Sequence, residues 1–272
     1  MSNAQLAWNN AVVDGATFTN YTASAADDGE AANMATASLS KRWVSYGLTG
    51  ADAAFDVTLT GAPTVAMIAL CSHNLTLAAT VRVRGYSAAY AATVYDSGTI
   101  SAWAASVTAA STVGMRWNFI HKLSTPTAAV IWRVEISDGA NPAGTIYVGR
   151  LFAGKSVWQP TINMLAGAGL GWESNSEIAK ALNGAEWFVD AEGHRVAKFN
   201  LANMPQAEML ANAFDLQRCA AGTQREVMFQ YDPADTEHSV RRSLFGRLRQ
   251  LTALEEPYAG TLKTAFEVKE LL

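Results

Sequence analysis

Short stretches in which apolar and polar residues alternate occupy the N-terminal half of the chain. Residues 55–60 and 81–84 alternate in this way, and so do residues 131–137. A period of two places neighbouring side chains on opposite faces, so each stretch predicts a half-buried β-strand. Residues 64–71 form a continuous apolar run that is too short for a helix and predicts a strand covered on both faces.

Two further strands are expected at residues 93–96 and 145–152. The second of them is expected to form a hairpin with residues 131–137, because the connecting segment 138–144 is rich in turn-forming residues. Repeated short strands, with no amphipathic helix of convincing length between them, predict an antiparallel β-sandwich over residues 1–158.

The C-terminal part, residues 159–272, is expected to form a β-rich domain with one packed helix near 204–220. The small, flexible residues 166–171 indicate a linker near its start. Asn203 and Gln206 predict a capping box, and the expected apolar face of the helix is Ala207, Leu210, Phe214 and Leu216. Strands are expected at 185–190 and 195–201, as a hairpin, and at 225–231, 239–249 and 262–270, with a loop at 255–258.

Composition and charge narrow the classes of function. Half of the 272 residues are hydrophobic and 16% are charged, which excludes disorder and predicts a largely neutral surface. A neutral surface is buried at small desolvation cost, which favours an assembly subunit. The net charge of −4 gives no basic footprint for nucleic acid, and the Arg241, Arg242, Arg247 and Arg249 group is expected to be the exposed face of a strand.

No metal, cofactor or catalytic site is predicted. The histidines at 73, 121, 194 and 238 lack a neighbouring ligand at metal-binding spacing, and Cys71 and Cys219 are expected to be separate buried thiols. No apolar run of about 18 residues indicates a membrane span, and the N-terminus lacks the pattern of a secretory signal. We therefore expect neither membrane insertion nor enzymatic activity.

Two acidic groups leave alternatives open. Asp27, Asp28 and Glu30, and the pair Glu255 and Glu256, lie in turn-like sequence and are expected to be solvated loops. A glycosidase would need two such carboxyls held across a sugar bond on a rigid scaffold. The first group remains an alternative calcium site, because calcium prefers several oxygen ligands.

Aromatic residues provide the candidate contact residues. Trp117 and Trp132 lie in strand-like sequence and are expected in the core. Tyr90 and Trp103 lie in loops rich in Ala and Ser, and they are the predicted exposed pair that contacts a glycan or a protein partner. The alternative is that each ring pins its own loop.

Six segments together resemble the discoidin, or galactose-binding-like, jelly roll. They are residues 33–45, 55–59, 68–75, 79–87, 131–136 and 146–154. Two departures limit the resemblance, since no disulfide joins the ends of the domain and no loop residue matches the sugar contacts of that family. The resemblance implies a jelly-roll sandwich and leaves carbohydrate binding as an alternative function, as a module for host-surface attachment.

A narrower resemblance links the chain to minor tail and tail-tip proteins of long-tailed bacteriophages. It rests on residues 72–75, 94–98 and 132–138, and on the segments 227–233, 244–247 and 266–271, which are similar to distal tail and baseplate proteins. It implies a structural subunit of the virion tail, made in the host cytoplasm. Its partners would be copies of itself in a ring, and neighbouring tail tube, hub or fibre proteins. We expect the C-terminal domain to make the ring contacts.

Overall fold

The computed structural model describes residues 2–13, 16–20, 29–45, 47–88, 90–181, 183–220 and 223–272. The chain divides into two compact units. The first unit comprises Met1–Gln159 and Gln230–Ser243, and the second comprises Pro160–Phe229 and Leu244–Leu272. Residues 230–243, which the sequence placed with the C-terminal domain, thus belong to the first unit, and we call them the strap.

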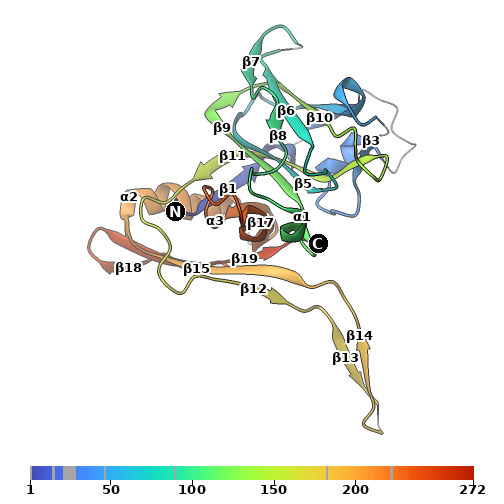
Figure 1. Cartoon of the computed structure of the whole chain (residues 1–272). Coiled ribbons are helices and arrows are strands. Elements are labelled where there is room, and N and C mark those ends of the chain that lie inside the picture. Colours follow the sequence, from blue (N-terminus) through green and yellow to red (C-terminus); the bar gives the residue numbers. More distant parts are fainter. Residues whose placement is uncertain are drawn as a thin grey trace. The chain divides into compact units, whose positions relative to one another are not determined.

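The first unit is built from two antiparallel sheets (Figure 1). One runs β1–β11–β5–β9, with β3 on β11, and the other runs β2–β4–β10–β6–β7, with β8 on β6. The strands of the first sheet are β1 (Gln5–Asn10), β3 (Trp43–Ser45), β5 (Thr64–His73), β9 (Asn118–Ala128) and β11 (Ile146–Trp158). Those of the second are β2 (Thr17–Asn20), β4 (Ala54–Thr58), β6 (Thr80–Tyr86), β7 (Thr93–Asp96), β8 (Ile100–Ser101) and β10 (Ile131–Ser137).

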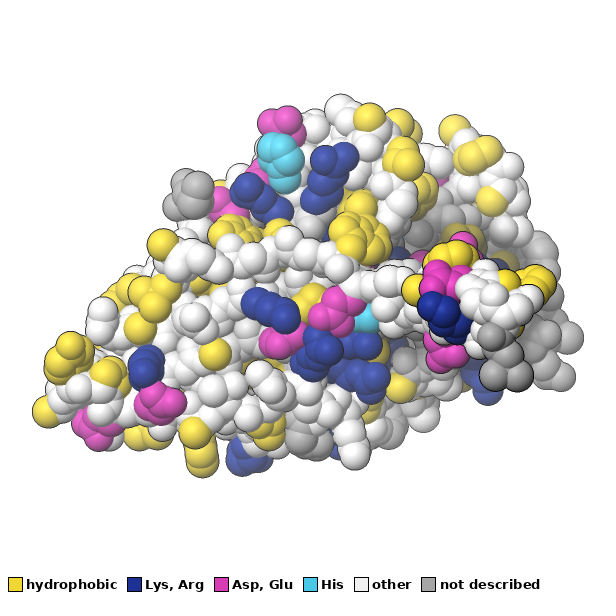
Figure 2. Space-filling view, turned by 90° about the horizontal axis from the view of Figure 1, so that it is seen from below, with side chains coloured by type: hydrophobic (Ala, Val, Ile, Leu, Met, Phe, Trp, Pro, Cys, Tyr) yellow, Lys and Arg dark blue, Asp and Glu magenta, His cyan; other side chains and the backbone are white. Residues whose placement is uncertain are grey.

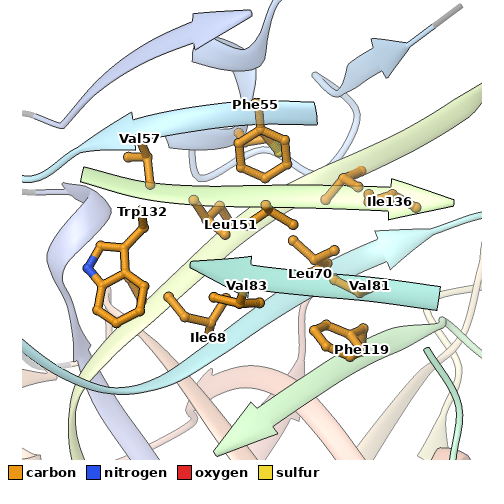
Figure 3. Packing of buried hydrophobic residues seen from close by; sticks show 14 of the residues in the cluster. Phe55, Val57, Ile68, Leu70, Val81, Val83, Phe119, Trp132, Ile136 and Leu151 are labelled. Atoms are coloured by element: carbon orange, nitrogen blue, oxygen red, sulfur yellow. The ribbon is translucent and has the colours of Figure 1, made fainter. Parts of the chain in front are cut away.

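One apolar cluster fills the space between these sheets (Figure 3). Phe55 of β4 and Trp132 of β10 are fully buried in it, together with Ile68 of β5 and Leu151 of β11. The side chains come from both sheets because each strand directs every second residue inward. The predicted antiparallel sandwich is confirmed, as is the core position of Trp132. Short helices lie in its connections: η1 (Ala11–Val13), η2 (Ala31–Ala35), η3 (Gly50–Ala53), α1 (Ala109–Thr112) and, in the strap, α4 (Ser239–Arg242).

The predicted hairpin between residues 131–137 and 145–152 is wrong. β10 pairs with β4 and β6, whereas β11 pairs with β1, β3 and β5, so the connection crosses from one sheet to the other. Asp138 fixes the start of this crossing, because its carboxylate accepts hydrogen bonds from the Thr76 backbone N–H (2.8 Å) and from the Thr76 hydroxyl. Alternation along a strand does not say which strand is its partner.

The second unit is a twisted antiparallel sheet with a helix packed on it. β15 (His194–Pro205) lies between β12 (Gly169–Glu173) and β19 (Thr261–Glu270), and β17 (Ser243–Leu248) follows on the other side of β19. The remaining strands are β16 (Glu226–Gln230) beside β17, β18 (Glu255–Tyr258) on β19, and the separate pair β13 (Glu177–Lys180) and β14 (Glu186–Val189). The predicted β-rich architecture with one helix is confirmed.

The helix runs through α2 (Gln206–Met209), the π-turn η4 (Leu210–Phe214) and α3 (Asp215–Cys219). Its predicted capping box is absent, because Asn203 still lies in β15 and Pro205 is the N-cap residue. Met209, Ala213 and Leu216 form the buried face, while Leu210 and Phe214 are exposed, contrary to the prediction. The predicted face mixed residues from two sides of the helix.

Four local predictions in the second part of the chain are also corrected. Residues 169–171, expected in a linker, form part of β12, and residues 255–258, expected in a loop, form β18. Residues 239–249 divide into the helix α4 and the strand β17, so Arg241 and Arg242 are helical. Cys219 is only half-buried. No helix in the described ranges is long and apolar enough to cross a membrane.

Candidate binding surfaces

Trp103 is buried rather than exposed. Its side chain is 8% exposed, and its indole N–H donates a 2.8 Å hydrogen bond to the Thr76 carbonyl. The ring packs edge to face against Trp117, at 5.3 Å between centroids, and against His73, at 5.4 Å. The ring therefore pins its loop, and its buried faces are not available for a sugar to stack on.

Tyr90 is 45% exposed, as predicted, but its hydroxyl is anchored. The Tyr90 hydroxyl donates to the carboxylate of Asp56, which is itself buried and also accepts a 2.9 Å bond from Arg133. The Arg133 guanidinium lies 4.9 Å from the centre of the Tyr90 ring. A cation stacked on one face leaves part of the ring exposed for contact with a partner.

The structure does not bring Tyr90 and Trp103 together. Trp103 follows Ser101, which pairs with Thr80 at the start of β6. Tyr90 packs against Tyr86, the last residue of β6, with 5.3 Å between ring centroids. Because a strand rises about 3.3 Å per residue, the two aromatic residues flank opposite ends of a strand of roughly 20 Å and do not form one site.

A groove of about 240 Å³ lies beside Trp103, wholly within the first unit. The sandwich contributes Ser101, Arg116 and Asn118, and the strap contributes Gln230, Asp235 and Ser239. Hydroxyl, amide, guanidinium and carboxylate groups thus line the same hollow, together with Trp103 and Phe119. Such a lining suits a neutral ligand with many hydroxyl groups, which can both donate and accept hydrogen bonds.

The strap is held against the sandwich by specific bonds. Asp232 accepts hydrogen bonds from the backbone N–H and hydroxyl of Ser2, at 3.0 and 2.6 Å, and Thr236 bonds Ser106 at 3.1 Å. Val240 packs against the apolar cluster of the sandwich. The groove wall is therefore a packed segment, and no sequence pattern indicated it.

Asp235 is the charged group that the strap adds to the groove. A hydrogen bond from the His238 backbone N–H lowers the pKa of its carboxyl below the usual value, and the Arg242 guanidinium, at 2.7 Å, lowers it further. Asp235 is thus ionised at neutral pH.

The second candidate surface is the β13–β14 hairpin, which we call the arm together with its flanks (residues 174–192, of which residue 182 lies outside the described part). A tight turn at Asn183 and Gly184 joins its strands, with φ +84° at Gly184. The predicted hairpin of residues 185–190 with 195–201 is therefore wrong, since 186–189 pair backward with 177–180. The Asn-Gly dipeptide was the sequence signal for this turn.

Both faces of the arm carry apolar side chains. Directly paired residues share a face, so Ile178 and Phe188 lie on one side, and Trp187 lies with Ala179 on the other. Ile178, Trp187, Phe188 and Val189 are 61%, 66%, 69% and 58% exposed. In Figure 1 the arm extends away from the other strands of its unit, so the sheet of that unit covers neither face.

Exposed apolar side chains are concentrated in the second unit. Among the described residues, 17 large hydrophobic side chains are exposed, and 13 of them lie in this smaller unit. Such a concentration marks this unit, rather than the sandwich, as the surface suited to protein contacts.

The acidic and histidine side chains do not form a metal or catalytic site among the described residues. Within the described ranges, no three His, Cys, Asp or Glu side chains are grouped so as to hold a metal ion. Glu255 and Glu256 are exposed neighbours on a strand and so point to opposite faces, which does not suit a pair of glycosidase carboxyls. Asp27 and Asp28, the core of the alternative calcium site, lie outside the described residues.

Comparisons with known proteins show that the sandwich resembles carbohydrate-binding modules in structure. No family model and no curated protein matches the chain. The chain is structurally similar to the family 32 carbohydrate-binding module from Streptococcus pneumoniae EndoD, with 18% identity over 53% of this chain and 97% of that one, at a TM-score of 0.39. The family 32 module from C. perfringens NanJ, solved in complex with galactose, is 12% identical over 54% and 96%, also at 0.39. At this level of similarity no ligand and no residue role carries over.

Proposed function

We propose that this protein is a non-enzymatic structural subunit that self-associates through its second unit. The observation that carries the proposal is the arm, whose two strands expose four large apolar side chains. An isolated two-stranded hairpin is only marginally stable in water, so these side chains gain stability when a partner covers them. The tail tip of a bacteriophage is the kind of particle that the sequence resemblance implies.

The test removes the apolar surface of the arm without shortening the chain. The double substitution Trp187→Ser and Phe188→Ser changes one large ring on each face. We expect the wild-type chain to form oligomers of defined mass by light scattering, and the variant to remain monomeric at the same concentration.

Val94→Ser with Val113→Ser is the matched control, because both valines are exposed in the first unit. This control should assemble as the wild type does. A wild-type chain that stays monomeric at its highest soluble concentration, or an arm variant that assembles normally, would contradict the proposal.

Carbohydrate binding in the groove is a second candidate function. It is favoured by the mixture of hydroxyl, amide, guanidinium and carboxylate groups around the 240 Å³ hollow. Trp103→Ala is a poor probe, because removing a buried Trp costs about 3–5 kcal/mol of stability whether or not the groove binds sugar.

A groove-filling substitution tests this candidate more cleanly. Ser239→Phe places a ring at the groove wall, and Ser40→Phe is the control at an exposed site outside the groove. We expect specific binding on a glycan array that is lost in the first variant and kept in the second. Absence of binding by the wild-type chain would reject the candidate.

A further inference from the structure

The outer face of the sheet in the second unit carries a group of charged side chains. Along β19 the burial alternates strictly, so that Leu262, Phe266 and Val268 face the core while Lys263 and Lys269 face away from it. Register places Lys198 of β15 opposite Glu267, and Arg247 of β17 opposite Lys269, on this same outer face. The helix packs on the other side of the sheet. Val196, opposite Lys269, and Phe245, two residues before Arg247, also lie on this outer face and are buried there.

Positive charge is in excess on this outer face. Its strands and their ends carry five basic residues, Lys198, Arg247, Arg249, Lys263 and Lys269, and three acidic ones, Glu173, Glu255 and Glu267. The acidic residues pair with Lys198, Arg249 and Lys263. Figure 2 looks at the molecule from below and shows Lys and Arg side chains gathered with acidic ones near its middle.

Arg247 and Lys269 are the two basic residues of this set that do not pair with its acidic residues. They are directly opposite each other across β17 and β19. Neither forms an ion pair with any part of the chain that the structure describes. Like charges directly opposite in a sheet repel each other, and a carboxylate from outside would relieve this repulsion.

The arm has the complementary character. Residues 174–192 contain Glu177, Glu186, Asp190 and Glu192 against a single basic residue, Lys180, which gives a net charge of −3. Lys180 is already paired with Glu186 at 3.3 Å. The arm therefore carries a net negative charge next to its exposed rings.

We infer that the arm of one copy docks on the outer sheet face of a second copy, with its carboxylates against Arg247 and Lys269. The inference rests on the proposed self-association and specifies which two surfaces meet in it. In its own chain the arm extends away from this face (Figure 1), so the two surfaces remain available for different neighbours. Because one surface meets a different surface, the contact is heterologous and repeats head to tail, which a closed ring requires.

The test uses two variants that each disable one side of the contact. Trp187→Ser with Phe188→Ser disables the arm, and Arg247→Glu with Lys269→Glu reverses the charge of the face. Each variant alone is expected to associate at least about tenfold more weakly than the wild type. Mixed in equal amounts, they should form a dimer and nothing larger, because only one intact arm and one intact face are then available per pair.

Lys41→Glu with Lys122→Glu is the matched control, since it changes the net charge equally at exposed positions of the first unit. It should assemble as the wild type does. If the arm variant is monomeric but the face variant assembles normally, or if the mixture stays monomeric, the inference fails and the proposed function stands. If the wild type does not assemble, the proposed function fails first.

Discussion

At the scale of single residues, the surroundings in space decided the role of each aromatic side chain. Trp103 lies in a neutral loop and was expected on the surface, yet its indole N–H bond to Thr76 and its contact with Trp117 bury it. Trp187 lies in a strand and is exposed, because among the described strands its strand pairs with β13 alone. Hydrophobicity alone does not distinguish these two tryptophans.

His73 couples the stability of the sandwich to pH. Burial lowers its pKa from 6.5 to about 3, since the ring packs near Trp103 and Trp117 and its Nδ1 accepts a 3.1 Å bond from the Leu75 N–H. As the pH falls below 6.5, the unfolded chain binds this proton before the folded chain does. The stability that neutral His73 contributes is therefore complete above pH 6.5 and is lost between 6.5 and about 3.

The substitution His73→Asn tests this assignment, because the asparagine side-chain oxygen can still accept the hydrogen bond from the Leu75 backbone N–H. Between pH 7 and pH 4.5 the wild type should lose about 2–3 kcal/mol more of its free energy of unfolding than this variant does. Urea unfolding followed by tryptophan fluorescence measures the difference. His238→Asn, at an exposed site, should keep the wild-type dependence, and equal pH profiles for all three chains would refute the assignment.

At the scale of elements, register and close packing decided where strands can lie. β17 approaches β19 so closely that a Cβ atom on Gly246 would lie 2.2 Å from the Lys269 carbonyl oxygen. A Cβ atom on Gly171 of β12 would meet no described atom within 4 Å. Two strand glycines of the same unit thus have different reasons to be present.

Gly246→Ala is expected to lower the free energy of unfolding by about 1–3 kcal/mol, because the backbone of β19 must move to admit the methyl group. Gly171→Ala should leave it unchanged or raise it by up to about 1 kcal/mol, since alanine loses less conformational entropy on folding. Thermal unfolding of both variants checks this contrast. Equal effects would show that the close approach at Gly246 does not govern the stability of the sheet.

At the scale of the whole molecule, the first unit is formed by two separate segments of the chain. Most of the second unit lies between the sandwich and the strap in the sequence. Bonds from Ser2 and Gln5 hold the strap, and Val240 packs against the sandwich core. Cutting the chain near residue 159 would therefore separate the first unit from its strap, because this unit is not one continuous segment of the sequence.

A chain truncated after residue 159 should consequently be less stable than the complete first unit. We expect residues 1–159 to bind a hydrophobic dye and to melt at a lower temperature than the same chain with residues 230–243 joined through a flexible linker. Differential scanning fluorimetry makes the comparison. If both chains melt at the same temperature, the strap contributes nothing to the sandwich.

The second unit also carries the features on which assembly is proposed. Its exposed rings lie in the same unit as Arg247 and Lys269, which form no ion pair with the described residues, so a single type of contact can use both. The sandwich, by contrast, offers the polar groove, and the two proposed functions therefore depend on different units and fail independently.

The sequence by itself determined the positions of most strands and the mainly β fold. Residues 55–59, 81–84 and 131–137 alternate because a pleated strand turns every second side chain toward a core, and this local rule needs no knowledge of neighbours. The helix after residue 204 was predicted from another local pattern, its apolar face, although Leu210 and Phe214 of that predicted face are exposed.

Only the tertiary structure decided which strands are partners and which apolar residues stay exposed. The sheet crossing between β10 and β11, the burial of Trp103 and the return of the strap all depend on contacts between residues far apart in the chain. The arm was misassigned although its Asn183-Gly184 turn was visible, because alternation marks two faces of a strand without saying what covers them. Whether a side chain is buried depends on the residues around it in space, and the pattern of residues along the sequence does not specify those neighbours.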